Sequence, residues 1–269
     1  MDLTGVTSLR AARTRDDLRL EPGEDVLAGG SWLFSEPQPA VTGLVDLTTM
    51  GWAPWTIHAG GLGVAATCTI AELLEAPFPG AWTASPLFRQ CAEAFLMSFK
   101  IWNTATVGGN LCLALPAGAM ISLATALDAD VVIWRPDGSE RRELVAELVL
   151  GVRRTTLQPG EVIRSLEIPA SSLRSRTAFR RIALTPMGRS SAIVIGRLDD
   201  DGRLALTVTA ATPRPYVFRF GSPPTDDELQ HLFAAVHGWY DDPHGAPDWR
   251  KAVTLDLAYD VCEELRSGS

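Results

Sequence analysis

The sequence predicts an α+β protein built from three successive parts. Short apolar runs alternate with helix signals over the first part, which indicates a small α/β unit. From residue 130 onward, hairpin patterns predict a mixed unit rich in antiparallel strands, and the tail carries two amphipathic helical patterns. We therefore expect an N-terminal α/β subdomain, a second subdomain and a C-terminal α+β domain. Their predicted ranges are 1–53, 54–172 and 178–269.

Before residue 75 the sequence contains three expected strands and one expected helix start. The strands cover 25–28, 42–47 and 55–61. The first of them runs directly into a Gly-Gly pair, as a strand that feeds a phosphate-binding loop would. Thr69 and Glu72 have the spacing of a capping box, in which each side chain accepts a hydrogen bond from the other residue's backbone N–H. That pair predicts a helix that begins at residue 70.

Two further helices are expected before residue 130. Apolar residues recur at helical spacing over 86–99, Leu87 and Phe95 among them, and Pro86 suits a first turn. The Met and aromatic residues of this segment are interpreted as core rather than as cofactor contacts. The other helix covers 119–128 and is mostly apolar.

The strands after residue 130 form two expected hairpins and one single strand. The first hairpin joins 131–134 to 140–144, and the second joins 191–198 to 203–211. Along the last of these segments apolar residues alternate with polar or small ones, which is typical of a half-buried strand. The single strand covers 162–168.

The tail predicts two amphipathic helices. They cover 225–238 and 248–266, and Thr225 and Glu228 supply a capping signature for the first.

Two Gly-Gly pairs, about 75 residues apart, are the most informative feature of the chain. The segments are Ala-Gly-Gly-Ser-Trp-Leu at 28–33 and Thr-Ala-Thr-Val-Gly-Gly-Asn at 104–110. Glycine lets backbone N–H groups approach an anion closely, because no Cβ intervenes. Ser31, Thr106 and Asn110 offer additional side-chain donors. One such pair is usually an ordinary turn, whereas the two together predict a diphosphate held from two sides.

Composition excludes several classes of function. The net charge of −8 argues against sequence-independent binding to nucleic acid or to an anionic membrane. No apolar run approaches the roughly 20 residues that span a bilayer, and the N-terminus lacks a basic-then-apolar leader pattern. We therefore expect a cytoplasmic protein.

The cysteines and histidines predict no metal site. The four cysteines contain no Cys-x-x-Cys pair, so neither zinc nor a cysteine-bound iron–sulfur cluster is indicated on this chain, and buried free thiols are expected. The four histidines have no i,i+4 pairing, and His237 and His244 are expected in a surface loop.

The motifs and their order resemble the FAD-binding, or medium, subunit of the molybdenum hydroxylases, which include xanthine dehydrogenase and carbon monoxide dehydrogenase. The first family loop is Ala-Gly-Gly-Thr-(Asp/Glu)-Leu, which 28–33 resembles, and 105–110 match Ala-Thr-(Ile/Val)-Gly-Gly-Asn throughout. Leu115–Gly118 resembles a Pro-Ala-Gly-Asp stretch, and 156–161 resembles a Leu-x-Pro-Gly-Glu turn. An aromatic residue followed by Lys or Arg corresponds to 179–181.

The resemblance implies a two-subdomain FAD-binding fold (PCMH-like) with a C-terminal α+β cap domain of the carbon monoxide dehydrogenase flavoprotein type. It implies FAD on this chain, with molybdopterin and 2Fe–2S clusters on a large and a small partner subunit, in a dimer of heterotrimers. Electrons would pass from the 2Fe–2S subunit through FAD to an external acceptor, and no residue of this chain would be catalytic. The cofactor contacts it implies are Ala28, Gly29, Gly30, Ser31, Trp32, Leu33, Ala105, Thr106, Gly108, Gly109, Asn110, Cys112, Gly118, Ile163 and Arg180.

Three positions depart from the family pattern. Trp32 replaces an acidic residue of the first loop, Ala119 stands where the family has Asp, and Trp102 replaces a common Arg. The two tryptophans either stack on a cofactor ring or pack in the core or at a subunit interface.

Two other functions stay open on the sequence. A stand-alone flavin oxidase or dehydrogenase of related fold would often use a His or Cys for covalent attachment, and His58 and Cys68 are the candidates near a loop. A non-enzymatic assembly protein that has lost its flavin is the other, because the acidic residues at 32 and 119 are missing.

Overall fold

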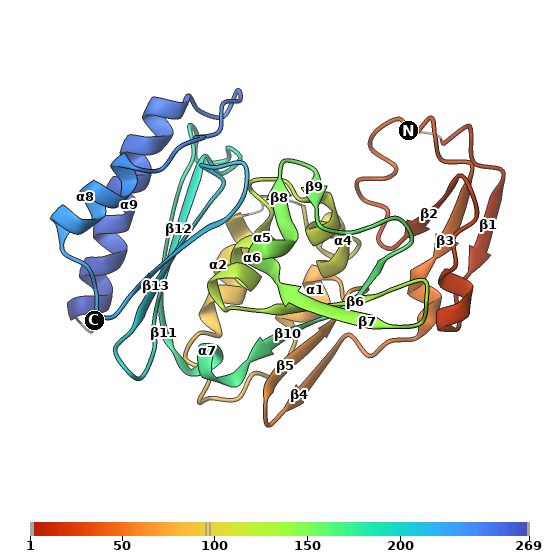
Figure 1. Cartoon of the computed structure of the whole chain (residues 1–269), viewed down its shortest axis with the longest axis horizontal. Helices are drawn as coiled ribbons and strands as arrows, with labels where there is room; N and C mark the ends of the chain where they lie inside the picture. Colours follow the sequence, from red (N-terminus) through yellow and green to blue (C-terminus); the bar gives the residue numbers. More distant parts are fainter. Residues whose placement is uncertain (1–2, 95, 97, 268–269) are drawn as a thin grey trace.

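Three sheets of three or more strands follow one another along the described part of the chain, with helices packed between and beside them (Figure 1). The computed structural model describes residues 3–94, 96 and 98–267. The first sheet is parallel, in the order β1-β3-β2, and two 3-10 turns, η1 and η2, accompany it. The bounds are β1 (Ser8–Ala11), η1 (Arg15–Leu18), β2 (Glu24–Leu27), β3 (Gly43–Asp46) and η2 (Leu47–Met50).

The second sheet is antiparallel, in the order β4-β5-β10-β6-β7. The bounds are β4 (Trp55–His58), β5 (Gly61–Ala65), β6 (Asp130–Trp134), β7 (Glu140–Leu144) and β10 (Val162–Pro169). A small separate hairpin joins β8 (Val149–Gly151) to β9 (Arg154–Thr155). The single strand predicted over 55–61 is wrong in its second half, because the chain turns after His58 and returns as β5.

Seven helices of the described residues belong to this middle part. They are α1 (Ile70–Leu74), α2 (Pro86–Ala94), α3 (Phe99–Trp102), α4 (Val107–Leu113), α5 (Ala119–Ala126), α6 (Val145–Leu148) and α7 (Ala170–Arg174). The predicted capping box is confirmed, since Thr69 N–H donates to Glu72 Oε2 at 2.8 Å and Glu72 N–H donates to Thr69 Oγ1 at 3.2 Å.

The helix predicted over 86–99 is too long. It ends at Ala94, and a separate short helix, α3, begins at Phe99. Leu96, between them, has a φ of 48°, a left-handed conformation that a continuous helix does not admit. Phe95, which we expected on the core face, lies outside the described residues.

The third sheet is an antiparallel meander in the order β11-β12-β13-β14. Figure 1 shows it between helices α8 and α9 on one face and the middle part on the other. The bounds are β11 (Arg176–Ile182), β12 (Ala192–Leu198), β13 (Leu204–Thr209), β14 (Tyr216–Phe220), α8 (Asp226–Ala234) and α9 (Pro247–Ser267).

Both faces of this sheet are covered. On β12, Ala192 and Val194 belong to the core shared with α9, whereas Ile193 and Ile195 belong to the core around α5. All six residues of β13 are therefore buried. The half-buried strand expected from the alternation over 203–211 is in fact a strand between two helical layers.

Helix α5 joins the middle part to this last sheet. Each of its residues, from Ala119 to Ala126, is buried, and it packs on both β12 and β13. A hydrogen bond of 2.7 Å links Ser122 Oγ to Thr209 Oγ1 across the contact. The described helices include none that combines the length and the apolar character needed to cross a membrane.

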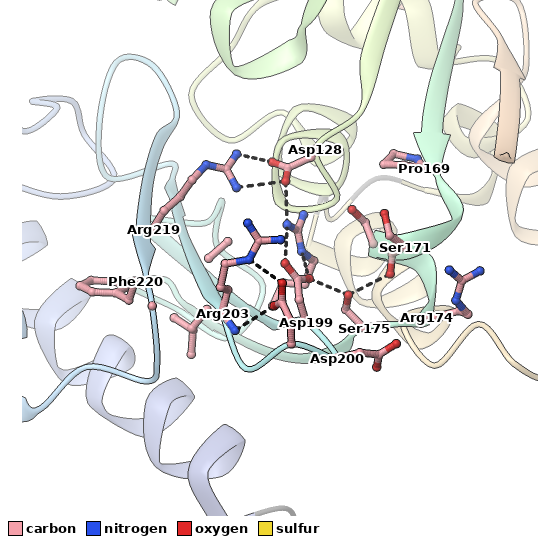
Figure 2. A pocket seen from close by; sticks show the side chains of 16 residues that line it. Asp128, Pro169, Ser171, Arg174, Ser175, Asp199, Asp200, Arg203, Arg219 and Phe220 are labelled. Carbon is pink, nitrogen blue, oxygen red and sulfur yellow. Dashed lines mark hydrogen bonds and ion pairs between the residues drawn. The ribbon is translucent and has the colours of Figure 1, made fainter.

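An ion-pair network ties the carboxyl end of α5 to the last sheet, beside a cavity of about 600 Å³ (Figure 2). The Asp128 carboxylate lies 2.6 Å from a guanidinium nitrogen of Arg197 and 2.6 Å from one of Arg219. Arg197, whose side chain is only 4% exposed, also pairs with Asp199 at 2.8 Å. Burial alone would raise the pKa of Asp128, but the hydrogen bonds from the two arginines outweigh it and hold that pKa below its ordinary value.

A second network fixes the turn that leads into β10. The Glu161 carboxylate accepts hydrogen bonds from Arg141 at 2.7 and 2.8 Å and from the Gln158 N–H at 2.9 Å, and lies 3.4 Å from Arg135. The hydrogen bond from Arg141 is the main cause that lowers the pKa of Glu161 to about 2. The Leu-x-Pro-Gly-Glu motif therefore ends in a structural carboxylate.

We expect Glu161→Gln to lower the free energy of unfolding at pH 7 by about 3 kcal/mol, at 1.36 kcal/mol for each unit of pKa shift. The folded pKa is below the ordinary value of 4.5, so this stabilisation is present above pH 4.5 and is lost as the pH falls toward 2. Chemical denaturation at several pH values between 7 and 3 measures it. The difference between the two proteins should shrink on acidification, and the exposed Glu75→Gln serves as the control. A difference that is constant with pH would contradict the assignment.

We expect Asp128→Asn to cost roughly 1–3 kcal/mol of unfolding free energy, because it leaves the buried Arg197 with one carboxylate instead of two. Asparagine tolerates the left-handed backbone of this position, where φ is 51°, so the change tests the charge. Asp200→Asn, at an exposed residue of the same cavity, is the matched control. Equal denaturation midpoints for both variants would show that the network contributes nothing.

Candidate functional site

Two adjoining cavities lie between the N-terminal part and the middle part. The apolar cavity, of about 280 Å³, is lined mainly by aliphatic side chains, and the loop cavity, of about 410 Å³, is lined by both Gly-Gly segments. Five residues line both cavities, which therefore form one cleft with a junction: Asp25, Val26, Ala28, Gly109 and Cys112. Such a cleft at a domain boundary is a common place for a cofactor.

The first Gly-Gly segment forms a loop with unused donors. It follows β2 directly, and Gly30 has a φ of 66°, which glycine adopts without strain. Within the described part of the chain, none of the backbone N–H groups from Gly29 to Leu33 donates to a partner, and the Ser31 hydroxyl has none either. A run of free N–H groups at a cavity forms a concave site for an anion.

We expected the second Gly-Gly segment to be a loop, but it forms the first turn of α4. Its N–H groups are used inside the protein: Gly108 donates to Ala66 O at 2.9 Å, and Gly109 donates to Thr106 Oγ1 at 3.1 Å. The prediction that this pair presents bare N–H groups to an anion is therefore wrong.

The glycines of this turn serve close packing instead. A Cβ on Gly108 would lie 2.8 Å from the Ala66 carbonyl oxygen, so only glycine lets α4 approach β5 this closely. A Cβ on Gly109 would meet Thr106 Oγ1 at 2.9 Å, and this residue lines both cavities.

The two polar atoms of the Asn110 side chain have different surroundings. Its Oδ1 accepts a hydrogen bond from Met120 N–H at 3.0 Å and so caps α5, whose own N-cap residue, Gly118, has no side chain. A Cβ on Gly118 would lie 3.1 Å from the same oxygen. Asn110 lines the loop cavity, and its Nδ2 has no partner among the described residues, which leaves a donor for a ligand. Gly118 and Ala119 line neither cavity.

Cys112 is the exception to the expectation of buried thiols. Cys68, Cys91 and Cys262 are buried, whereas Cys112 is exposed to the space at the junction of the two cavities. The surrounding protein raises the pKa of the Cys112 thiol to about 12, and the Asp25 carboxylate adds to the shift. The thiol is therefore protonated at neutral pH.

Most of the predicted cofactor contacts converge on this cleft, and a few do not. Ile163 lines the apolar cavity, and Ala105 and Thr106 line the loop cavity with all six residues of 28–33. Arg180 lies on β11, pairs with Glu264 of α9 at 2.7 Å and lines neither cavity.

The two unusual tryptophans have different surroundings. Trp32 lines the loop cavity, and the Arg153 guanidinium lies 5.6 Å from its ring centroid. Trp102 is half-buried against the main core. Both indole N–H groups are buried, and neither has a hydrogen-bond partner among the residues that the structure describes.

Sequence reasoning missed Arg153 and Asp25. Arg153 belongs to the turn between β8 and β9, and Asp25 lies on β2; both line the loop cavity. The only signal for Arg153 is the adjacent pair Arg153-Arg154 shortly before the Leu-x-Pro-Gly-Glu motif.

The candidates for covalent flavin attachment lie away from the cleft. His58 ends β4 on an exposed turn, 3.4 Å from Glu167, and Cys68 is buried, with its pKa raised to about 12. Neither residue lines either cavity.

Solved structures share the whole architecture of this chain. Quinoline 2-oxidoreductase from Pseudomonas putida 86 aligns with a TM-score of 0.80 and 21% identity over 97% of both chains. Carbon monoxide dehydrogenase from Oligotropha carboxidovorans aligns with a TM-score of 0.83 and 20% identity over 96% of both chains. These likenesses confirm the predicted fold class.

Curated relatives match part of the chain. The beta subunit of caffeine dehydrogenase from a Pseudomonas species (strain CBB1) is 33% identical over 122 residues, 42% of this chain and 41% of that protein. The FAD subunit of nicotinate dehydrogenase from Eubacterium barkeri is 28% identical over 156 residues, 55% of this chain and 49% of that protein. The matches thus span less than half the length of either relative. Residues 7–171 match the family model of the FAD-binding domain in molybdopterin dehydrogenase, and the chain belongs to that family.

Proposed function

We propose that this chain is the FAD-binding electron-transfer subunit of a molybdopterin-dependent hydroxylase or dehydrogenase. In this function it passes electrons from a 2Fe–2S subunit through FAD to an external acceptor. The observation that carries the proposal is the run of free N–H groups from Gly29 to Leu33 at the wall of a two-part cleft. The cleft consists of an apolar cavity, a junction beside the free N–H groups and a second cavity. A dinucleotide has a matching order of parts: an aromatic base, a diphosphate and a second ring system.

The residues present fit FAD. The apolar cavity, lined by Leu20, Leu47, Leu157 and Ile163 among others, suits the flat adenine ring. The N–H groups of the first loop and the Ser31 hydroxyl would hold the diphosphate near the junction, with Asn110 Nδ2 as a further donor. The larger loop cavity would then contain the ribityl chain and the ring end of the flavin.

The chemistry of electron transfer belongs to the flavin when it is bound. This chain supplies the shape of the cleft, the donors that neutralise the diphosphate and the charges around the ring. Cys112, protonated at the junction, adds a thiol without a negative charge.

Partner subunits follow from the same proposal. We expect a large molybdopterin subunit and a small 2Fe–2S subunit. In support, the matched family model describes an FAD-binding domain of molybdopterin dehydrogenases, and both curated relatives are named as subunits. A dimer of heterotrimers and a cytoplasmic location stay predictions. The stand-alone flavoenzyme is disfavoured, because neither His58 nor Cys68 reaches the cleft.

Purification of the full chain, co-expressed with the products of its neighbouring genes, tests the proposal. The visible spectrum, the released chromophore and the iron and molybdenum contents are measured. Released FAD with iron and molybdenum in the same particle supports the electron-transfer subunit. FAD without either metal would favour a stand-alone flavoenzyme. No flavin after reconstitution with excess FAD would overturn the proposal.

We expect Gly29→Ala to weaken FAD binding by at least about tenfold, which is about 1.4 kcal/mol. A Cβ at this position would lie 1.7 Å from the Thr104 carbonyl oxygen, so the loop that bears the free N–H groups must move. Equilibrium dialysis of FAD against the full chain measures the affinity. Gly80→Ala is the control, because a Cβ there meets nothing within 4 Å. Equal affinities for the two variants would remove the first loop from the site.

A further inference from the structure

Arg153 is the cationic side chain of the loop cavity. Among the residues that line this cavity, it is the sole Lys or Arg, and Asp25 is the sole carboxylate. The Arg153 guanidinium forms no ion pair or hydrogen bond with the described residues, whereas most of the arginines that line the cavities outside this cleft form ion pairs. Its charge is therefore available to a molecule in the cavity.

Backbone and ring contacts hold Arg153 in this position. Its φ of 54° is a left-handed conformation that non-glycine residues seldom adopt, and its N–H donates to Ala114 O at 2.9 Å. The ring of Trp32 faces its guanidinium at 5.6 Å from the centroid, a distance that suits a cation–π contact.

Arg153 lies at the end of the cleft where the proposed function places the flavin ring. The junction with the apolar cavity lies at Ala28 and Gly109, and Arg153 does not line the apolar cavity. Its backbone is bonded to Ala114, between Leu113 and Leu115, which line the loop cavity alone. With adenine in the apolar cavity and the diphosphate near the junction, the rest of the loop cavity, where Arg153 faces Trp32, is left for the flavin end of the molecule.

We propose that Arg153, held against Trp32, raises the reduction potential of the flavin. This inference rests on the proposed function. Two-electron reduction with uptake of one proton leaves the ring with one negative charge, and a cation beside the ring stabilises that form over the neutral oxidised form. Arg153 is thus a residue that tunes the cofactor, and no bond forms to it.

The test is an equilibrium redox titration of FAD bound to the full chain, followed by flavin absorbance at constant pH. Three variants are compared with the wild-type protein: Arg153→Gln, Arg153→Lys and Arg154→Gln. The last is the matched control, because Arg154 is the adjacent arginine, is exposed as Arg153 is, and lines neither cavity.

We expect the Arg153→Gln potential to fall by about 30 mV or more, which is a tenfold loss in the preference for the reduced form of a two-electron couple. Arg153→Lys and Arg154→Gln should stay close to wild type. An Arg153→Gln potential equal to that of wild type would overturn the inference and leave the proposed function intact. A wild-type chain that retains no FAD would instead refute the proposed function.

Binding of ADP decides the case in which Arg153→Gln retains no FAD. ADP carries the adenine and the diphosphate but no flavin ring. If the variant binds ADP as wild type does, Arg153 acts at the ring end, as the inference requires. If ADP affinity falls together with FAD affinity, Arg153 contacts the diphosphate and the inference is wrong.

Discussion

The approach of Gly29 to the Thr104 carbonyl is the contact on which the cleft depends. A Cβ on Gly29 would lie 1.7 Å from that oxygen, so the first loop and the segment before α4 meet backbone to backbone. This contact brings the small parallel sheet against the middle part. A side chain there would separate the two walls of the cleft and move the loop whose free N–H groups face it. Glycine at this position is needed for space, whereas Gly30 is needed for its left-handed backbone.

The two walls of the cleft have different tasks. Helix α4 uses its first N–H groups for contacts with Cys68, Ala66 and Thr106, which fixes the wall but leaves it few donors. The first loop keeps its donors free. Asn110 connects the cleft to α5 through Met120 N–H, and α5 in turn packs on the last sheet. A change at the cleft and a change in the last sheet therefore act on the same buried helix.

The sequence was sufficient where the signal is local. The capping box at Thr69, the hairpin around 135–138 and the strand before the first loop depend on neighbouring residues, and the structure has all three. The end of α2 at Ala94 was not predictable, because apolar residues continue at helical spacing beyond it. The resemblance implied that Arg180 contacts the cofactor, but Arg180 pairs with Glu264. That glutamate belongs to a helix more than 80 residues later, so only the tertiary fold reveals the pair. Arg153 was missed for the same reason, since it reaches the cavity from a hairpin far from either glycine pair.

The departure from the family pattern at position 32 changes the charge of the cleft beside Arg153. The family pattern that the first loop resembles has an acidic residue at position 32, beside Arg153. Tryptophan offers its ring to the guanidinium instead, and a cation–π contact leaves the charge of the arginine uncompensated. Asp25 lies at the junction, at the other end of the loop cavity, and does not replace the missing carboxylate. The departure at position 32 therefore leaves the backbone N–H groups of the first loop free as donors, and it leaves the Arg153 side of the loop cavity more positive than an acidic residue would.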